Sequence, residues 1–373
     1  MKIKNPNIVV TGGKTGGHIY PALAIADIIQ KEFSVQPHYI GSKNGMESKI
    51  LKKENIPFYG ISFAPIVGVS PLKKIKAFFI DLGGFFASLL LLIKIKPKLI
   101  IGTGGFVAGP VLAAAFVLGV PIIIHEQNVT PGFTNKILAK ISREIWITFN
   151  ESAKYFPNNK RKVLTGMPLR NNFQKLNPNE SKEYFGIKEN NKVLLIAGGS
   201  QGSKLINDAV RPIYKKIIQE LGLTIIHITG PRFYDEIVKG LDNEEVELLE
   251  SGKLIIKDYI NEMELALNAA EITISRAGAS FICELIATKS YSILIPIKNS
   301  ASNHQLKNAK AIEKVGMGRI IEEDALTSEN LYSTLTTLRP FEFENIITSN
   351  AGILYGENTK DIIRKESGKY LNE

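Results

Sequence analysis

Cysteine is almost absent from this sequence. Cys283 is the single cysteine among 373 residues, which excludes an internal disulfide framework and fits a reducing compartment. The opening residues, MKIKNPNIVV, run into an apolar segment without the hydrophobic core of a secretory signal peptide. We therefore expect a cytoplasmic protein.

Two familiar nucleotide-binding motifs are incomplete. Gly13-Lys14-Thr15 matches the end of a P-loop, but a P-loop needs a glycine five residues earlier, and that position is Ile8. The dinucleotide fingerprint G-x-G-x-x-G also fails, because Gly12 is followed two places on by Lys14. These gaps count against an ATP or GTP hydrolase and against a Rossmann dehydrogenase. What remains is a strand, a glycine-rich turn and a helix, whose N–H groups suit an anion such as a diphosphate.

Metal-binding patterns are missing as well. The sequence has no Asp-x-Asp pair of the kind that chelates a nucleotide-bound divalent ion, and its histidines show no metal-ligand spacing. We expect no essential metal and no other cofactor. Helix dipoles, backbone N–H groups and basic side chains would then meet the charge of a diphosphate.

Residues 70–98 fall short of the roughly 20 uninterrupted apolar residues that a transmembrane helix requires. Six lysines flank an apolar run in this segment, and the run is broken by Asp81 and two glycines. Its lysines and phenylalanines favour a helix that lies on an anionic membrane surface. A helix buried against a sheet is the alternative, and a helix with one face in the core and the other on the membrane is also consistent.

Positive charge is concentrated in the first half of the chain. Residues 1–165 carry 21 Lys or Arg against 8 Asp or Glu, whereas residues 166–373 carry 25 against 28. The first half is therefore expected to meet an anionic partner. Nucleic acid and an anionic membrane leaflet both fit this charge, and the lysine-flanked segment favours the membrane.

Strand-like and helix-like segments alternate along the chain, which is typical of an α/β protein with parallel sheets. We expect strands at residues 8–11, 38–41, 98–102, 121–125 and 144–148. After a polar stretch at 157–192, KVLLIAGGSQGSKLINDAV repeats the opening order of strand, glycine turn and helix. Further strands are expected at residues 223–229, 254–257, 271–275, 292–296 and 319–321. Two Rossmann-like domains, residues 1–164 and 165–344, would face a cleft, with a last helix at 345–373 packing back on the first domain.

Eight blocks follow one another in an order that indicates a family. They are GGKTGGHIYPALAIA, IGTGGFVAGP, GVPIIIHEQNVTPGFTNKILAK, TGMPLR, AGGSQGSKLIN, DYINEM, SRAGASFICELIA and SASNHQLKNA. In them the chain resembles the MurG family, bacterial transferases that add N-acetylglucosamine (GlcNAc) from UDP-GlcNAc to the lipid-linked muramyl-pentapeptide intermediate of peptidoglycan synthesis.

The resemblance implies a glycosyltransferase B fold and an inverting, metal-independent transfer. The acceptor would be the muramyl 4-hydroxyl of the undecaprenyl-diphosphate-linked intermediate, lipid I, and the product lipid II. The C-terminal half would hold UDP-GlcNAc, while the N-terminal half would hold the acceptor and meet the membrane. Such a protein is peripheral, lies at the cytoplasmic face of the inner membrane and has no nucleic-acid partner.

The resemblance also assigns donor contacts. Glu284 matches a carboxylate that binds the ribose diol, since two adjacent hydroxyls can donate to it. Ser200 matches a diphosphate contact, although a serine that opens a helix is otherwise typical of an N-cap. A helix beginning beside Glu284 would direct its first N–H groups at the diphosphate, and its residues are Ala279, Ser280, Phe281, Ile282 and Cys283. The remaining donor residues are Arg170 for charge, Ile260 for the uracil, and Gln305, with neighbouring His304, for the sugar hydroxyls.

Acceptor contacts fall in the first half. His18 is the first candidate for the general base because the ordinary pKa of histidine lies near working pH, and it could instead donate to the acceptor diphosphate. Glu126 is the second candidate. Residues matching positions near the transferred sugar and the acceptor are Thr15, Gly16, Gly17 and Asn128.

The chain departs from the family at a few positions. Lys14 replaces a usual glycine, and Phe106 and Ala108 stand where the family has hydroxyl side chains. Lys14 could contact the diphosphate of the lipid or point into solvent, and we favour solvent. Two other functions stay open: a related membrane transferase that glycosylates another lipid, and a non-catalytic UDP-sugar-binding protein at the membrane.

Overall fold

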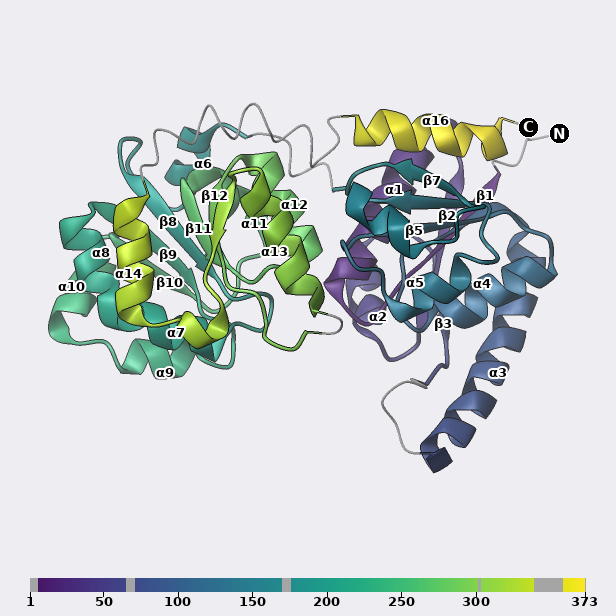
Figure 1. The fold of residues 1–373 in the computed structure, drawn as a ribbon, viewed down its shortest axis with the longest axis horizontal. Coiled ribbons are helices and arrows are strands. Elements are labelled where there is room, and N and C mark those ends of the chain that lie inside the picture. Colours follow the sequence, from purple (N-terminus) through teal and green to yellow (C-terminus); the bar gives the residue numbers. More distant parts are fainter. Residues whose placement is uncertain (1–5, 65–70, 170–175, 301–302, 339–357, 373) are drawn as a thin grey trace. The chain divides into compact units, whose positions relative to one another are not determined.

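The computed structural model describes residues 6–64, 71–169, 176–300, 303–338 and 358–372. The chain divides into two compact units: a first unit of residues 1–170 with 356–373, and a second unit of residues 171–355. Each unit is built on one sheet of parallel strands (Figure 1). The predicted α/β fold class with two Rossmann-like sheets is confirmed.

The sheet of the first unit has seven strands in the order β3-β2-β1-β4-β5-β6-β7. Its order reverses between β1 and β4, which makes the carboxyl ends of these two strands a topological switch point, where α/β proteins commonly bind ligands. The strands are β1 (Asn7–Thr11), β2 (Gln36–Ser42), β3 (Phe58–Ile61), β4 (Pro97–Gly102), β5 (Ile122–Glu126), β6 (Glu144–Ile147) and β7 (Arg161–Leu164).

Helices cover both faces of this sheet. Because side chains alternate along a strand, Val9 of β1 joins the core on one face, and Ile8 and Val10 join the core on the other. The helices are α1 (Gly16–Phe33), α2 (Met46–Ile50), α3 (Pro71–Ile95), α4 (Ala108–Val117), α5 (Phe133–Leu138) and α16 (Thr359–Leu371), with short 3₁₀ turns η1 (Leu51–Lys53) and η2 (Asn150–Tyr155).

Helix α3 has two different apolar faces. Its inner face includes Leu92, which is buried in the core beside α4, while Phe86 and Leu90 on its outer face are 54% and 69% exposed. Two of the three residues that interrupt the apolar run face inward: Asp81 accepts a hydrogen bond from the backbone N–H of Ala64, and Gly84 lies so close to the carbonyl of Ser62 that a Cβ would approach it to 2.5 Å. Among the residues described, no helix is long and apolar enough to cross a bilayer.

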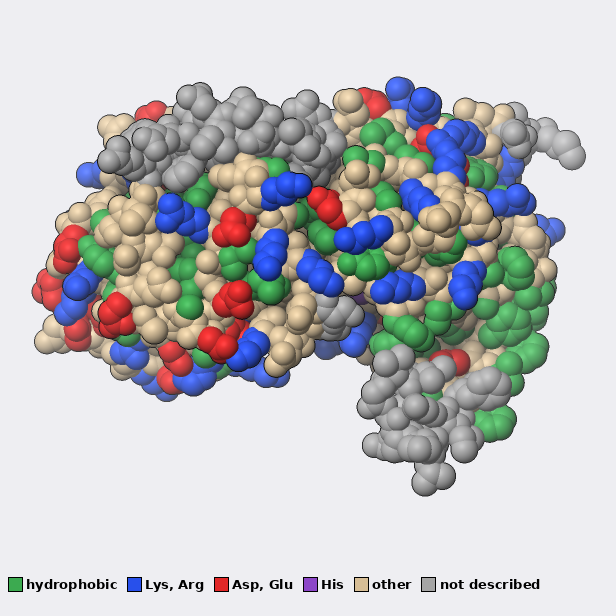
Figure 2. All heavy atoms as spheres, in the orientation of Figure 1, with side chains coloured by type: hydrophobic (Ala, Val, Ile, Leu, Met, Phe, Trp, Pro, Cys, Tyr) green, Lys and Arg blue, Asp and Glu red, His purple; other side chains and the backbone are tan. Residues whose placement is uncertain are grey.

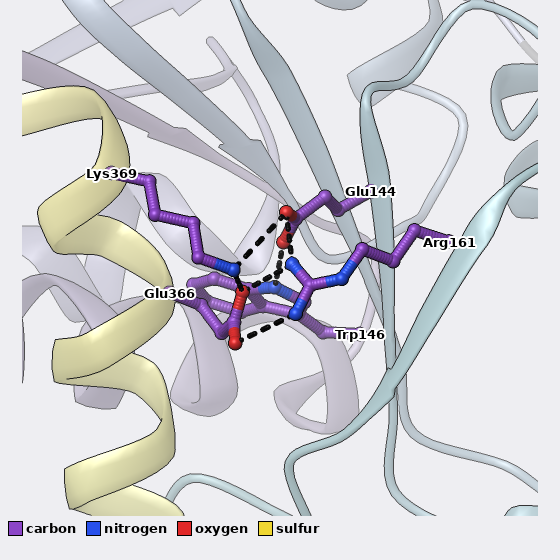
Figure 3. A network of polar contacts seen from close by, with 5 residues as sticks. All are labelled: Glu144, Trp146, Arg161, Glu366 and Lys369. Carbon is purple, nitrogen blue, oxygen red and sulfur yellow. Dashed lines mark hydrogen bonds and ion pairs between the residues drawn. The ribbon is translucent and has the colours of Figure 1, made fainter.

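Helix α16 is held to the sheet of the first unit by packing and by charge. It packs on α1 and buries Ile363. Its Glu366 carboxylate accepts hydrogen bonds from the Arg161 guanidinium of β7, which also contacts Glu144 of β6 (Figure 3). Lys369 completes the network. The expected last helix is therefore present from Thr359 onward, and its predicted beginning at 345–357 lies outside the described residues.

The sheet of the second unit has six strands in the order β10-β9-β8-β11-β12-β13, with its switch point between β8 and β11. The strands are β8 (Lys192–Ala197), β9 (Leu223–Ile228), β10 (Leu254–Lys257), β11 (Ile272–Ser275), β12 (Tyr291–Leu294) and β13 (Gly318–Ile320). Its helices are α6 (Pro178–Tyr184), α7 (Lys204–Val210), α8 (Tyr214–Glu220), α9 (Tyr234–Lys239), α10 (Asn243–Glu250), α11 (Met263–Ala269), α12 (Ala279–Thr288), α13 (His304–Lys314) and α14 (Ser328–Thr337), with 3₁₀ turns η4 (Arg211–Ile213) and η6 (Glu323–Ala325).

Two strands escaped the sequence prediction. β3 and β7 are four residues long and form the two edges of the first sheet. Their side chains are mostly exposed or half-buried, so neither strand has the apolar run of a central parallel strand. β7 also lies in the polar stretch at residues 157–192, where no strand was expected.

Candidate functional site

Two glycine-rich loops meet at the switch point of the first unit. The loops follow β1 and β4, and a Cβ on Gly105 would lie 2.5 Å from the carbonyl oxygen of Gly13. Gly105 also has a φ of +81°, in the left-handed region that favours glycine. The Thr103 hydroxyl, which the sequence argument missed, ties the loops together by donating to the carbonyl of His18 at 2.7 Å. The glycines are therefore needed for contact between two backbones.

His18 lies in the first turn of α1, above the β4 loop. A Cβ on Gly104 would come within 2.9 Å of the imidazole Cδ2, so the ring occupies space that only glycine leaves. Its Nδ1 is 3.2 Å from the carbonyl oxygen of Gly13 and 3.3 Å from the Thr15 hydroxyl. A carbonyl oxygen can only accept, so the neutral ring carries its proton on Nδ1 and its lone pair on Nε2. This tautomer can take a proton at Nε2.

Glu126 ends β5 and is 1% exposed. Its Oε1 accepts hydrogen bonds from the backbone and side-chain amides of Asn128, at 2.9 and 3.1 Å. Its Oε2 accepts from the backbone of Gly132 and from Asn135 Nδ2, at 3.2 and 2.9 Å. Burial raises the pKa of Glu126, and these hydrogen bonds oppose that rise. With four donors on its two oxygens, Glu126 is placed to hold the loop that carries Asn128.

The remaining acceptor-side candidates lie in the same region. Thr15 precedes α1, and Gly16 and Gly17 are its first two residues. Lys14, in the loop after β1, is exposed, as expected. Its Nζ lies 5.3 Å from the centre of the ring of Phe106, which belongs to the loop after β4. The ammonium of Lys14 thus makes a cation–π contact while the side chain stays exposed to solvent.

The loops after β8 and β11 carry the donor-side candidates of the second unit. Ser200 is exposed in the glycine turn, and α7 begins only at Lys204 with Ser203 as its N-cap. An N-cap role for Ser200 is therefore wrong. Gly199 in the same turn has a φ of +98°, and no described heavy atom would lie within 4 Å of a Cβ there.

Helix α12 begins directly after the β11 loop. Its first residues are Ala279, Ser280, Phe281, Ile282 and Cys283, as the sequence predicted. No side-chain hydrogen bond caps this end, and the backbone N–H of Ile282 already donates to the carbonyl of Gly278. The N–H groups of Ala279, Ser280 and Phe281 precede the first intrahelical bond and can meet an anion. Glu284 follows and is half-buried. Burial raises the pKa of the Cys283 thiol, and the charge of Glu284 adds to the rise, which leaves this cysteine an inert core residue.

The other donor-side candidates lie near strand ends. Gln305 is in the first turn of α13, and its Oε1 accepts a hydrogen bond from the backbone of Ile297 at 3.0 Å. Ile260 is 6% exposed, so its side chain belongs to the core and only its backbone can serve a ligand. Arg170 lies outside the described residues. Within the described part of the chain, no group of three or more His, Cys, Asp or Glu could hold a metal ion.

Family models and similar sequences both identify the family of this chain. Models of the glycosyltransferase family 28 N-terminal and C-terminal domains match residues 8–147 and 193–360. Relatives from Desulforamulus reducens and Clostridium perfringens are 37% and 39% identical, over 95% and 90% of this chain and 96% and 91% of theirs. The chain belongs to glycosyltransferase family 28. Both relatives are named UDP-N-acetylglucosamine–N-acetylmuramyl-(pentapeptide) pyrophosphoryl-undecaprenol N-acetylglucosamine transferase.

Solved structures agree with this membership. MurG of Acinetobacter baumannii is 27% identical, with a TM-score of 0.72 over 98% of this chain and 99% of its own. A UDP-glucose:anthocyanidin 3-O-glucosyltransferase shares the fold, with a TM-score of 0.71 at 14% identity over the whole of both chains. The resemblance that the eight motif blocks predicted, the glycosyltransferase B fold and the enzyme class are thereby confirmed.

Three side chains of this family 28 member were missed by the sequence argument. Thr103 and Asn135 lie inside quoted motif blocks but are ordinary residues in isolation, and only their contacts with His18 and Glu126 reveal their place. Arg276, in the SRAGAS block, lies at the switch point of the second unit and contacts Ser203. The position of Arg276, a basic residue directly after a predicted strand, is the sequence feature that could have identified it.

Proposed function

We propose that this family 28 protein transfers GlcNAc from UDP-GlcNAc to the 4-hydroxyl of the lipid-linked muramyl-pentapeptide, converting lipid I to lipid II in peptidoglycan synthesis. Relatives with this activity in their names cover nearly the whole chain. The structural observation that best supports this proposal is the contact of His18 Nδ1 with the carbonyl oxygen of Gly13. This contact leaves the lone pair of the imidazole on Nε2.

His18 is the general base in this proposal. Its Nε2 takes the proton of the acceptor hydroxyl as that oxygen attacks the anomeric carbon of GlcNAc. The bond from this carbon to the diphosphate breaks, UDP leaves with the electron pair, and the new β-1,4 bond has the inverted configuration. Thr15, Gly16, Gly17 and Asn128 contact the acceptor and the transferred sugar. Glu126, which accepts four hydrogen bonds, positions Asn128 and is the weaker candidate for the base.

The second unit binds the donor. Ser200 and the N–H groups of the first three residues of α12, Ala279, Ser280 and Phe281, meet the diphosphate, and Arg170 adds its charge. Glu284 accepts from the ribose hydroxyls, the backbone of Ile260 meets the uracil, and Gln305 bonds the sugar. The reaction requires no metal. In this division of labour residues 1–164 form the acceptor domain and residues 165–344 the donor domain.

The first unit also carries the surface for the membrane. Apolar side chains gather over α3 and the end of α4 (Figure 2). The exposed residues, which we call the α3 patch, are Phe79, Leu82, Phe86, Leu90, Ile93, Phe116, Val117 and Leu118. The exposed lysines at and after the end of α3, Lys94, Lys96 and Lys98, would meet anionic headgroups while this patch enters the interface. The protein would thus act as a peripheral protein at the cytoplasmic face of the inner membrane, where its acceptor is anchored.

A transfer assay with labelled UDP-GlcNAc and lipid-linked muramyl-pentapeptide tests the activity. His18→Ala should lower turnover by about 100-fold or more while UDP-GlcNAc affinity stays unchanged, and near-normal turnover would refute the assignment. Turnover on a diacylglycerol acceptor alone would favour a glycolipid synthase, and UDP-GlcNAc binding without any transfer would favour a binding protein. Complete loss of activity in EDTA would refute the metal-free mechanism.

Membrane binding is tested by vesicle sedimentation. Phe86→Asp should release the protein from phosphatidylglycerol-containing vesicles, because it places a charge in the centre of the α3 patch. Leu205→Asp is a matched control, since Leu205 is 49% exposed on α7 of the second unit. Equal effects of the two substitutions would contradict a membrane role for α3.

A further inference from the structure

Arg276 joins the carboxyl ends of four strands in the second unit. It directly follows β11, and its side chain is 13% exposed. Its Nη2 donates to the Ser203 hydroxyl at 2.8 Å, at the end of the glycine turn after β8. Its Nη1 donates to the carbonyl of Ile295 at 3.2 Å, directly after β12, and to Glu323 Oε1 at 2.6 Å, in the η6 turn after β13. These four strands are neighbours in the sheet.

Glu323 extends the connection to a second loop. Its other oxygen accepts a hydrogen bond from the backbone N–H of Lys298 at 2.9 Å. One residue earlier, the backbone N–H of Ile297 donates to Gln305. The ion pair of Arg276 and Glu323 therefore fixes the segment that Gln305 contacts, as well as the turn that carries Ser200.

The chemistry of this pair favours positioning over direct contact with a diphosphate. Both terminal nitrogens of Arg276 already donate to protein acceptors, and the carboxylate of Glu323 neutralises the guanidinium in a setting that is largely removed from solvent. The guanidinium carries its donors on two separate terminal nitrogens, so it can reach acceptors that lie further apart than a single lysine ammonium can span.

We propose that the ion pair of Arg276 and Glu323 is the positioning element of the donor-nucleotide loops. It sets the distance between the glycine turn after β8, the start of α12 and the loop after β12, and neither side chain touches the nucleotide. This inference rests on the proposed donor site and deepens it, because it adds two residues that control donor affinity without contributing a ligand.

Binding of UDP to the purified full-length protein, measured by calorimetry, is the test. Glu323→Gln and Arg276→Lys should each weaken UDP binding about tenfold or more, because loops displaced by a fraction of an ångström no longer match the ligand. The KM for UDP-GlcNAc should rise by a similar factor while the KM for the lipid acceptor stays unchanged. The KM shift is a readout that a general loss of stability would not produce selectively.

Glu323→Gln decides between positioning and direct charge contact. If Arg276 bound the diphosphate directly, removal of its neutralising carboxylate would strengthen UDP binding, and that result would overturn the proposal. Wild-type UDP affinity in Arg276→Lys would overturn it too. Lys298→Gln is the matched control, because the Lys298 side chain pairs with Asp324 of the same turn at the exposed surface; its UDP affinity should stay within about twofold of wild type.

The two proposals fail in different ways. If the wild-type protein transfers no sugar to the lipid acceptor, the proposed reaction is wrong, yet the UDP affinities of the variants still test the positioning role. If transfer occurs and the variants bind UDP normally, the reaction stands and the positioning role is wrong. Circular dichroism of Glu323→Gln, which is nearly isosteric, identifies a variant that has failed to fold, and Arg276→Lys then supplies the measurement.

Discussion

The buried imidazole of His227 should make the stability of the second unit depend on pH. His227 lies on β9 with no exposed surface. Its Nε2 lies 3.0 Å from Asn207 Oδ1, and Asn207 Nδ2 donates to the carbonyl of Thr229, so the oxygen of this amide accepts from His227. Nδ1 therefore accepts from the hydroxyl of Tyr214. The neutral ring is fully bonded in this arrangement, and burial lowers the pKa of His227 to about 3.

The sign and size of the effect follow from proton linkage. Above the ordinary histidine pKa of about 6.5 the folded and unfolded states are both neutral, and His227 adds no pH dependence. Below that value only the unfolded state takes up the proton, so the free energy of unfolding falls by about 1.4 kcal/mol per pH unit. At about pH 5 the loss amounts to about 2 kcal/mol from this one residue.

Urea unfolding of the wild type and of His227→Gln, at pH 7.5 and at about pH 5, measures this contribution. All other titrating groups occur in both proteins, so their effects cancel in the difference between the two free energies. That difference should shrink by about 2 kcal/mol on acidification. A difference that stays constant would show that the ring is not held neutral, and would refute the argument.

Three further predictions concern the first unit. Replacing Lys14 by glycine should raise the KM for the acceptor severalfold at low salt and less at high salt, and an unchanged KM would place Lys14 outside the acceptor site. Burial would raise the pKa of Glu366, but Arg161 lowers it to about 2. Glu366→Gln should therefore lower the free energy of unfolding at neutral pH by about 1–2 kcal/mol, a modest value because the half-exposed Arg161 is screened by solvent. The substitution should also reduce the stability that is lost between pH 4.5 and 2. Tryptophan fluorescence during urea unfolding measures both effects. Glu126→Gln should keep the acid limb of the pH–rate profile of kcat, and loss of that limb would favour Glu126 as the base.

The fold was largely predictable because parallel strands carry a strong signal. Central strands such as β5 and β9 are buried on both faces and appear in sequence as short apolar runs. The edge strands β3 and β7 lack that signal. Strand β7 owes its place to long-range contacts: Arg161 bonds Glu366, 205 positions further along the chain. No local pattern contains that information.

The candidate site was predictable to the level of its loops. The motif blocks place His18 and the start of α12 after the loops that follow two predicted strands, and Glu126 directly after a third. In the structure His18 and α12 follow the β1 and β11 loops, and Glu126 ends β5. Local sequence patterns do not show which other side chains hold these residues in place. The bond between Thr103 and His18 joins residues 85 positions apart, and the pair of Arg276 with Glu323 joins residues 47 positions apart. Such partners follow from the order of strands in a sheet, which sequence spacing alone does not fix.

The glycines at the switch points of the two sheets have different structural roles. In the first unit, a Cβ on Gly12 would lie 2.1 Å from the Thr103 hydroxyl, and one on Gly105 would strike the backbone of Gly13. These glycines let two loops touch, so a loop that resembles a phosphate cradle in sequence is a packing contact beneath His18. In the second unit, a Cβ on Gly199 or on Gly278 would meet no described atom within 4 Å. Glycine there leaves the backbone uncovered, as the proposed contact of a diphosphate with backbone N–H groups would require.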